Sequence, residues 1–212
     1  MPKSTRDNNS PWKDGFLFLG NQLVLDFLNT RPVQDDEPME LLPDFTAVVR
    51  WFHAAGLLKD HEAASFTRKW GETSLGRRVV EDMRRLRESL RKAVLRWEAG
   101  QELHESARNE LNRLMAEHPM RTRLQNSGRE PSAELYFEPQ RPEDLFAPLA
   151  YSAAMLFASA NRKRVRKCDQ CILHFLDTSK KGTRRWCSME LCGNRLKVAA
   201  YAARKRAVSI HG

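Results

Sequence analysis

Hydrophobic side chains recur at helical spacing through most of the chain, and this periodicity predicts a mainly helical protein. The longest pattern covers residues 75–99, where apolar residues return every third or fourth position between arginines and Gly100 follows as a stop signal. Another helix is expected to open at Pro43-Asp44 and to end at Gly56. Shorter apolar patterns predict further helices over residues 61–70, 103–117 and 143–160.

The pattern is different near the start of the chain. Residues 1–15 are polar and are expected to form a disordered leader. The run FLFLGNQLVLDFLNT at 16–30 predicts a short strand broken by Gly20, followed by either a helix or a buried strand over Leu23 to Leu28. Prolines and acids make residues 31–40 a predicted loop.

A hairpin is predicted at residues 121–139, because Asn126-Ser127-Gly128 lies between two short runs of alternating apolar and polar residues. Together with the helices, this hairpin predicts a mainly helical α+β domain over residues 16–160. Residues 161–212, called the finger below, are expected to form a separate small unit that begins with the basic link 161–167.

Charge separates the finger from the rest of the chain, which has 212 residues and a net charge of +9. Residues 161–206 hold 14 lysines and arginines against three acids, whereas the remaining residues hold 22 against 24. Charge of one sign concentrated in one segment favours an anionic partner, although a solvated basic tail would have the same composition.

Composition also bears on the compartment. An apolar share of 41% is enough to build a core. The sequence has no run of about 18 apolar residues, so no membrane span is expected. Its first residues have no apolar signal-peptide core, so we expect a cytoplasmic protein with reduced thiols. In that compartment, four cysteines favour a metal site over disulfides.

The four cysteines, Cys168, Cys171, Cys187 and Cys192, follow the spacing C-x2-C-x15-C-x4-C. Zinc prefers four ligands in a tetrahedron, and sites with four thiolates are structural because no position stays open for water. The spacing therefore predicts one structural zinc ion per chain, which would supply folding free energy to a small segment. The alternatives are four unliganded cysteines packed as small apolar residues, and His174 as a substitute ligand instead of an ordinary strand residue.

Between the cysteine pairs the sequence predicts a second hairpin. One strand is supplied by the apolar residues Ile172, Leu173, Phe175 and Leu176, the turn by Ser179 to Gly182, and the return by Arg184 to Trp186, with Trp186 in a small core. Ser188 is placed to cap a helix that begins before the fourth cysteine. A C-x2-C knuckle, a hairpin and a helix in this order resemble a treble-clef zinc finger.

Several motifs are similar to those of a known bacterial family. The run from Cys168 to Arg195 contains LDTS, RRWCSM and CGNR, and it resembles the CGNR zinc finger. Gly20, LDFLNT at 25–30 and the Leu-Leu-Pro-Asp run at 41–44 resemble the ABATE domain, the usual partner of this finger. The resemblance implies a bacterial, stress-induced transcription regulator that binds zinc and DNA and whose N-terminal domain senses a small ligand.

The helix predicted within LCGNRLKVAAYAARKRAV carries a basic face backed by small residues, which suits contacts with phosphates or a groove. Arg195 either joins this surface or braces the zinc hairpin, and Asn194 either caps backbone groups or reads a base. The candidate nucleic-acid contacts are Arg184, Arg185, Arg195, Lys197, Tyr201, Arg204, Lys205 and Arg206.

Three functions are compatible with these observations. The first is a DNA-binding regulator, able to act as a homodimer, whose candidate ligand contacts are Asp26, Asn29 and Thr30 in LDFLNT. The second is a zinc-stabilised module for protein interaction or RNA binding without recognition of a DNA sequence. The third is an enzyme, which is disfavoured because no nucleophile elbow, phosphate loop or HExxH motif occurs. A structural alternative has Asp26 bonding to backbone and Asn29-Thr30 closing an element.

Overall fold

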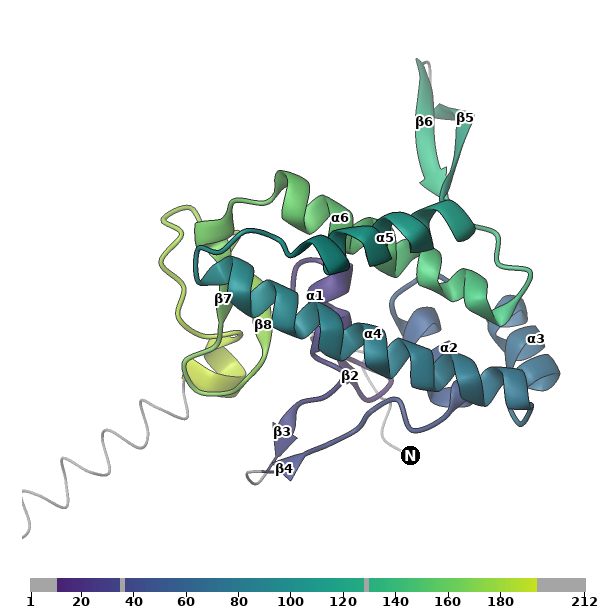
Figure 1. Cartoon of the computed structure of the whole chain (residues 1–212), viewed down its shortest axis with the longest axis horizontal. Helices are drawn as coiled ribbons and strands as arrows, with labels where there is room; N and C mark the ends of the chain where they lie inside the picture. Colours follow the sequence, from purple (N-terminus) through teal and green to yellow (C-terminus); the bar gives the residue numbers. More distant parts are fainter. Residues whose placement is uncertain (1–10, 35–36, 128–129, 194–212) are drawn as a thin grey trace, which may run out of the picture.

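Helices make up most of the computed structural model, which describes residues 11–34, 37–127 and 130–193 (Figure 1). The α-helices are α1 (Leu23–Leu28), α2 (Phe45–Ala54), α3 (Asp60–Trp70), α4 (Ser74–Glu98), α5 (Glu105–Glu117) and α6 (Phe146–Ser159). Shorter helical turns are η1 (Pro142–Leu145), η2 (Arg162–Arg164) and η3 (Met189–Gly193). The predicted mainly helical α+β class is confirmed, and the segment that was open to two interpretations is helix α1.

Local signals set several helix ends where the sequence predicts them. The Asp44 carboxylate accepts a hydrogen bond of 2.8 Å from the Ala47 N–H and so caps the start of α2. The Thr73 hydroxyl does the same for α4, at 3.0 Å from the Gly76 N–H. Beyond the ends of α2 and α4, Gly56 and Gly100 have φ angles of +76° and +93°, a conformation that glycine adopts without strain.

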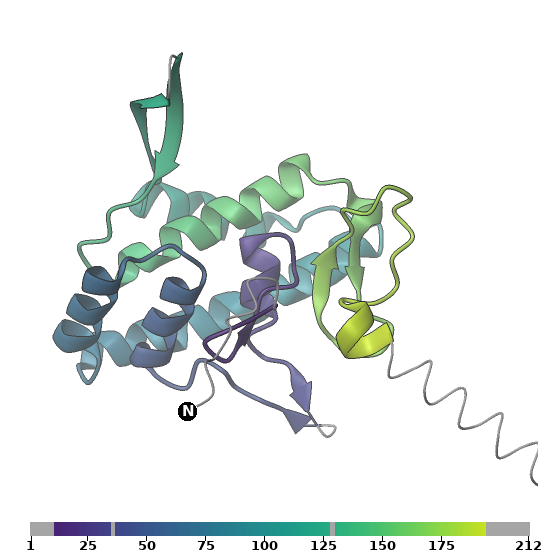
Figure 2. The ribbon, with the colours of Figure 1, turned by 180° about the vertical axis from the view of Figure 1, so that it is seen from behind.

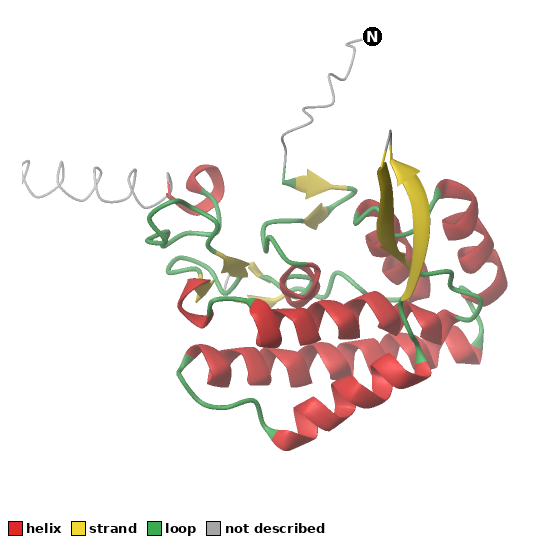
Figure 3. Cartoon of the chain, turned by 90° about the horizontal axis from the view of Figure 1, so that it is seen from above, coloured by secondary structure: helices red, strands yellow, loops and turns green. Residues whose placement is uncertain are grey.

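Helix α4 is the longest element, and α5 and α6 lie beside it as a layer of long helices (Figures 1 and 3). Short α1 contacts both α4 and α6, so its Val24, Leu25, Phe27 and Leu28 are fully buried. Trp51 of α2 packs on Phe27 and Phe52, with ring centroids 5.8 and 5.1 Å apart. The core of the helical domain therefore centres on α1.

The strands of the described residues form four antiparallel pairs, all short except one. They are β1 (Trp12–Lys13) with β2 (Phe16–Leu17), β3 (Val33–Gln34) with β4 (Glu37–Pro38), β5 (Arg121–Ser127) with β6 (Glu130–Tyr136), and β7 (Val165–Lys167) with β8 (His174–Leu176). The long β5–β6 hairpin agrees with the prediction for residues 121–139, and it projects away from the helices (Figures 1 and 2).

Two segments expected to lack regular structure contain strands. The predicted leader 1–15 includes β1, because Asp14 and Gly15 adopt positive φ angles and turn the chain back onto β2. Residues 1–10 lie outside the described residues. The predicted loop 31–40 contains the two-residue strands β3 and β4.

The predicted hairpin between the cysteine pairs is wrong in its pairing. Strand β8 pairs with β7, which lies in the segment expected to be only a link, and not with residues 184–186. The reason is that the Asp177 carboxylate accepts the backbone N–H of Arg184 at 2.9 Å, so this N–H is not available to a strand. Residues 184–186 consequently form an irregular loop.

None of the described helices combines the length and the apolar character that a membrane crossing requires.

Candidate metal centre and its attachment to the helical domain

The four cysteines come together at one end of the molecule. Cys168 and Cys171 lie in the turn that joins β7 to β8, whereas Cys187 precedes η3 and Cys192 lies within it. All four sulfur atoms are within 4.8 Å of one another. The Sγ of Cys187 is 3.6 Å from that of Cys171 and 3.6 Å from that of Cys192, and the Cys171–Cys192 distance is 3.7 Å.

These distances fit a tetrahedral metal site. Four sulfurs at about 2.3 Å from a zinc ion are about 3.8 Å apart along each edge of the tetrahedron. A disulfide would instead need sulfurs about 2.05 Å apart, and all four cysteines are free. The thiolate set therefore suits a soft divalent ion such as zinc, and His174 is not part of the cluster.

The thiols perturb one another's pKa values, as expected of groups placed to share a cation. The hydrogen bond with Cys168 raises the pKa of Cys171 to about 12. Hydrogen bonds from Cys171 and Cys187 lower the pKa of Cys168, because they stabilise one thiolate in the cluster. When zinc is bound, its two positive charges compensate the thiolates that the cluster otherwise disfavours.

Short-range contacts hold the cysteines in position. The Cys168 N–H donates to the Leu173 carbonyl at 2.9 Å, which closes the turn of the first cysteine pair. The Ser188 hydroxyl accepts from the N–H groups of Glu190 and Leu191 at 3.2 and 3.3 Å, as predicted for a capping residue. Trp186 packs against the small cluster around the cysteines, which confirms its predicted place.

Arg184, a predicted nucleic-acid contact, has its guanidinium hydrogen-bonded to backbone carbonyls of the finger. Its Nε donates to the Trp186 carbonyl at 2.7 Å, and its Nη2 donates to the Cys187 carbonyl. The guanidinium also lies over the Phe175 ring, 4.7 Å from the centroid. The side chain therefore braces the loop that leads to the third cysteine, and its guanidinium is not free for a phosphate.

The Asn29 side chain, directly after α1, attaches the finger to this helix by pairing with a backbone segment of β8, as a neighbouring strand would. The Asn29 amide donates to the His174 carbonyl at 2.9 Å and accepts from the His174 N–H at 2.8 Å. One residue pair further along, the Leu176 N–H donates to the Gly20 carbonyl at 2.8 Å and the Asn21 amide donates to the Leu176 carbonyl at 2.9 Å. Figure 2 shows β8 beside α1 in this arrangement.

The other members of the polar set in LDFLNT also have intramolecular partners. The Asp26 carboxylate accepts from the Gly20 N–H at 2.7 Å, and burial raises its pKa to about 6. The Thr30 hydroxyl donates to the Phe27 carbonyl at 2.7 Å. The described part of the chain has four surface pockets whose linings do not include Asp26, Asn29 or Thr30. The geometry thus favours the structural alternative over a ligand site at Asp26, Asn29 and Thr30.

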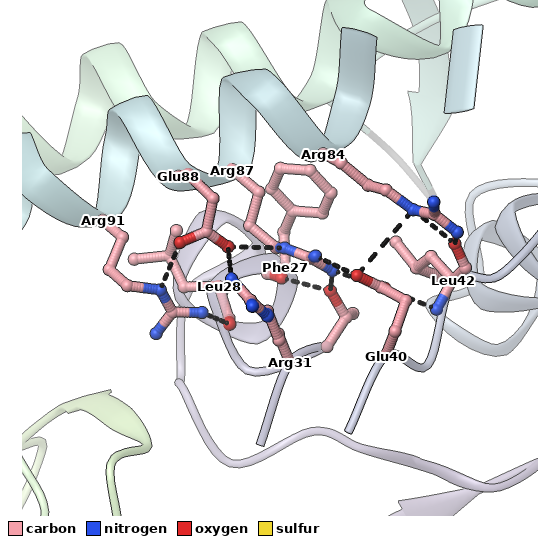
Figure 4. A network of polar contacts seen from close by, with 10 residues as sticks. Phe27, Leu28, Arg31, Glu40, Leu42, Arg84, Arg87, Glu88 and Arg91 are labelled. Carbon is pink, nitrogen blue, oxygen red and sulfur yellow. Dashed lines mark hydrogen bonds and ion pairs between the residues drawn. The ribbon is translucent and has the colours of Figure 1, made fainter. Parts of the chain in front are cut away.

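Beneath α1, charged side chains form a network that the sequence analysis did not identify (Figure 4). Arg87 is almost fully buried, and its Nη1 donates to Glu40 at 2.9 Å and to the Thr30 hydroxyl at 2.8 Å. Arg91 donates to the Leu28 carbonyl at 2.5 Å and contacts Glu88 at 3.4 Å. In the sequence, Arg87 stands in the apolar stripe of the long helix α4, between Met83 and Leu90. That position is the signal that could have indicated a buried arginine.

The predicted nucleic-acid contacts divide into two groups. Arg185 is described, with a side chain 69% exposed and an ion pair of 2.7 Å to Asp169. Asn194, the predicted helix and six further candidates lie outside the described residues: Arg195, Lys197, Tyr201, Arg204, Lys205 and Arg206.

Asn29→Asp is expected to weaken the attachment of the finger. The change replaces the amide donor with an oxygen that faces the His174 carbonyl, so one buried hydrogen bond is lost and an unpaired acceptor remains. The free energy of unfolding should fall by about 2 kcal/mol, and hydrogen exchange of β8 should become faster.

Asn21→Asp is the matched control, because Asn21 makes a similar bond to Leu176 at an exposed position. It should change stability by much less. Equal effects of the two substitutions would mean that Asn29 does not carry the attachment.

Together, the helical domain and the four-thiol cluster define a zinc-finger protein whose finger is attached to a mainly helical α+β core. The chain belongs to the ABATE family, described as "Putative stress-induced transcription regulator", whose model matches residues 21–160. The CGNR zinc finger model matches residues 164–205, so both resemblances seen in the sequence are confirmed in the same order. The comparison with curated proteins gave no match.

Proposed function

We propose that this protein is a zinc-dependent, DNA-binding transcription regulator without catalytic activity, whose finger contacts DNA. The observation that carries the proposal is the excess of positive charge in residues 161–206, where 14 basic residues stand against three acids. A metal-stabilised finger that concentrates this charge supplies the phosphate-neutralising term on which DNA affinity depends.

The described part of the finger contributes exposed positive charge on one loop. Lys180 and Lys181 are exposed and form no ion pair with any residue that the structure describes. Arg185 is exposed beside the same loop. Because Arg184 is bonded inside the finger, the candidates for phosphate contacts, of which about four to six would bind at once, are Lys180, Lys181 and Arg185, together with Arg195, Lys197, Tyr201 and Arg204 to Arg206.

The second candidate is a zinc-stabilised module that binds a protein or RNA. The ion pair between Arg185 and Asp169 favours it to a small extent, since it removes one cation from the phosphate-binding surface. The two candidates differ in their response to DNA sequence. Saturable binding to one genomic fragment over a scrambled duplex would support the regulator, and equal binding to both would favour the alternative.

Substitution of Lys197, Arg204 and Lys205 together by alanine is expected to weaken all DNA binding. Each phosphate that is neutralised releases counterion, so about four to six contacts in the parent should give a log–log salt slope of roughly −4 to −5. The triple variant should have a slope flatter by about three contacts. Fluorescence anisotropy with a labelled duplex over a series of salt concentrations measures both quantities.

Two results would change this assignment. Loss of binding to one sequence alone would identify the three residues as base readers. Unchanged affinity at low salt would show that they contact no DNA, and the protein-interaction candidate would then be preferred.

A further inference from the structure

A pocket of about 650 Å³ lies between α4 and the start of α5, and no residue of the finger belongs to its lining. Its volume is in the range of pockets that hold small molecules. Ala93 and Ala107, each 8% exposed, belong to its lining and give it an apolar wall. The pocket thus has the size and the partly apolar lining of a small-molecule site.

The polar lining of the pocket is mainly cationic. Arg85, Ser89, Lys92 and Arg96 follow one another at helical spacing and form one stripe along α4. Across the pocket, His104 and Ser106 at the start of α5 bond to each other, and Ser89 of the stripe donates to Glu110 at 3.1 Å. The groups left to contact a ligand are therefore the two arginines and the lysine of the stripe, which suit the several oxygens of a phosphate.

The cations of this stripe keep free donors. Lys92 is exposed and forms no ion pair within the described part of the chain. Arg96 uses its Nε for Gln101, at 2.8 Å, and its other guanidinium nitrogens have no partner among the described residues. The acid in the lining, Glu88, is compensated by Arg31, Arg87 and Arg91, each 3.4 Å away.

We propose that this pocket binds a small phosphate-bearing molecule and that it is the ligand site of the helical domain. The inference adds a ligand site to the proposed regulator, and it rests on that proposed function only for the regulatory role of the ligand. An extended nucleic acid is the less suitable occupant, because the pocket is concave and carries Glu88 among its cations.

The pocket is connected to the finger by consecutive polar contacts, which can be followed in part in Figure 4. Glu88 lines the pocket and contacts Arg91, and Arg91 donates to the Leu28 carbonyl at the end of α1. The next residue, Asn29, holds β8 of the finger. A ligand that displaces Glu88 would therefore act on the anchor of the finger.

The test is calorimetric titration of the zinc-loaded full chain with inorganic pyrophosphate at constant ionic strength. Lys92→Ala combined with Arg96→Ala should weaken pyrophosphate binding about tenfold or more, because two charge-assisted contacts are lost. Arg68→Ala combined with Lys69→Ala removes the same charge from α3, outside the pocket and outside the proposed DNA surface, and it should leave pyrophosphate affinity within about twofold. Ser106→Trp fills the pocket at unchanged net charge and should also abolish binding.

The proposal is overturned if the parent does not bind pyrophosphate, or if the α3 variant loses as much affinity as the pocket variant. The same variants are then titrated with duplex DNA. Loss of DNA binding in the pocket variant but not in the α3 variant would make the pocket part of the nucleic-acid surface and would also contradict the proposal. If pyrophosphate binds in the pocket while DNA does not bind the parent, the DNA-binding function fails and the ligand site stands.

Discussion

Cys187→Ala is expected to abolish zinc binding and to unfold the described part of the finger. The Cys187 sulfur lies 3.6 Å from two of the other three, so its loss removes one of four ligands from a closed site. Structural zinc contributes about 10–16 kcal/mol of apparent binding free energy in small fingers, and three thiolates hold the ion far less tightly. The zinc content of protein purified without added metal, measured by elemental analysis, should fall from about one ion per chain to near zero.

Met189→Ala provides the control for this change. Met189 is two residues away in the same turn and 47% exposed, so its truncation should leave the zinc content unchanged. Hydrogen exchange of residues 165–192 gives a second measurement that does not depend on the metal analysis. A Cys187→Ala protein with full zinc content and a protected finger would refute the four-cysteine assignment.

Arg87→Met is expected to have the second largest effect, through the buried ion pair with Glu40. The Arg87 side chain is 2% exposed and the Glu40 side chain 28%. Removing Arg87 leaves Glu40 with Arg84, 3.8 Å away, as its remaining cation and takes a donor from the Thr30 hydroxyl, so the free energy of unfolding should fall by about 3 kcal/mol, the lower end of the range for a broken buried pair. Chemical denaturation should show this loss as a lower midpoint with an unchanged slope.

The pH dependence of this effect has a defined sign. Burial raises the pKa of Glu40, but the hydrogen bonds from Arg87 and the Leu42 N–H, with the charges of Arg87 and Arg84, together outweigh it, so the pKa of Glu40 is lowered on folding. The contribution of a group with a lowered pKa is present above its unfolded pKa and disappears as the pH falls through its folded pKa. The difference between the parent and Arg87→Met should therefore shrink in acid.

Arg85→Met is the matched control on the same helix. Its side chain is 71% exposed, and its ion pair with Asp82 is on the surface. Such a pair contributes about 0–1 kcal/mol. If Arg87→Met is no more destabilising than Arg85→Met, the network beneath α1 contributes no more than a surface pair.

Features that depend on neighbours in the sequence could be predicted. The helices follow from apolar periodicity and from nearby caps such as Asp44, whose partner is three residues away. The zinc ligands follow from the spacing of the cysteines, because short turns bring two of them together. These signals are local, so one sequence is enough to read them.

Features set by distant contacts could not be predicted in the same way. The N–H of Val24 in α1 donates to the Ser152 hydroxyl, a residue 128 positions later, at 3.0 Å. This hydrogen bond satisfies a backbone N–H in the first turn of α1 and so favours the helix over a strand at Leu23–Leu28. No residue near Val24 in the sequence indicates it. The role of Asn29 depends likewise on His174, and that of Arg184 on carbonyls exposed by an irregular loop. In each case the partner, and not the residue itself, determines the role.

The helical part and the finger each contribute an apolar residue to the buried cluster of the other. Leu17, which precedes the ABATE match, packs in the cluster around the cysteines, whereas Val165 of the finger belongs to the helical core. Folding of either part thus contributes to the stability of the other, and metal binding at one end raises the melting temperature of both. A fragment cut at the boundary between the two family matches would expose apolar surface on each side. Zinc supply would therefore set the amount of folded full-length protein, because the packing of Leu17 and Val165 couples the finger to this helical core.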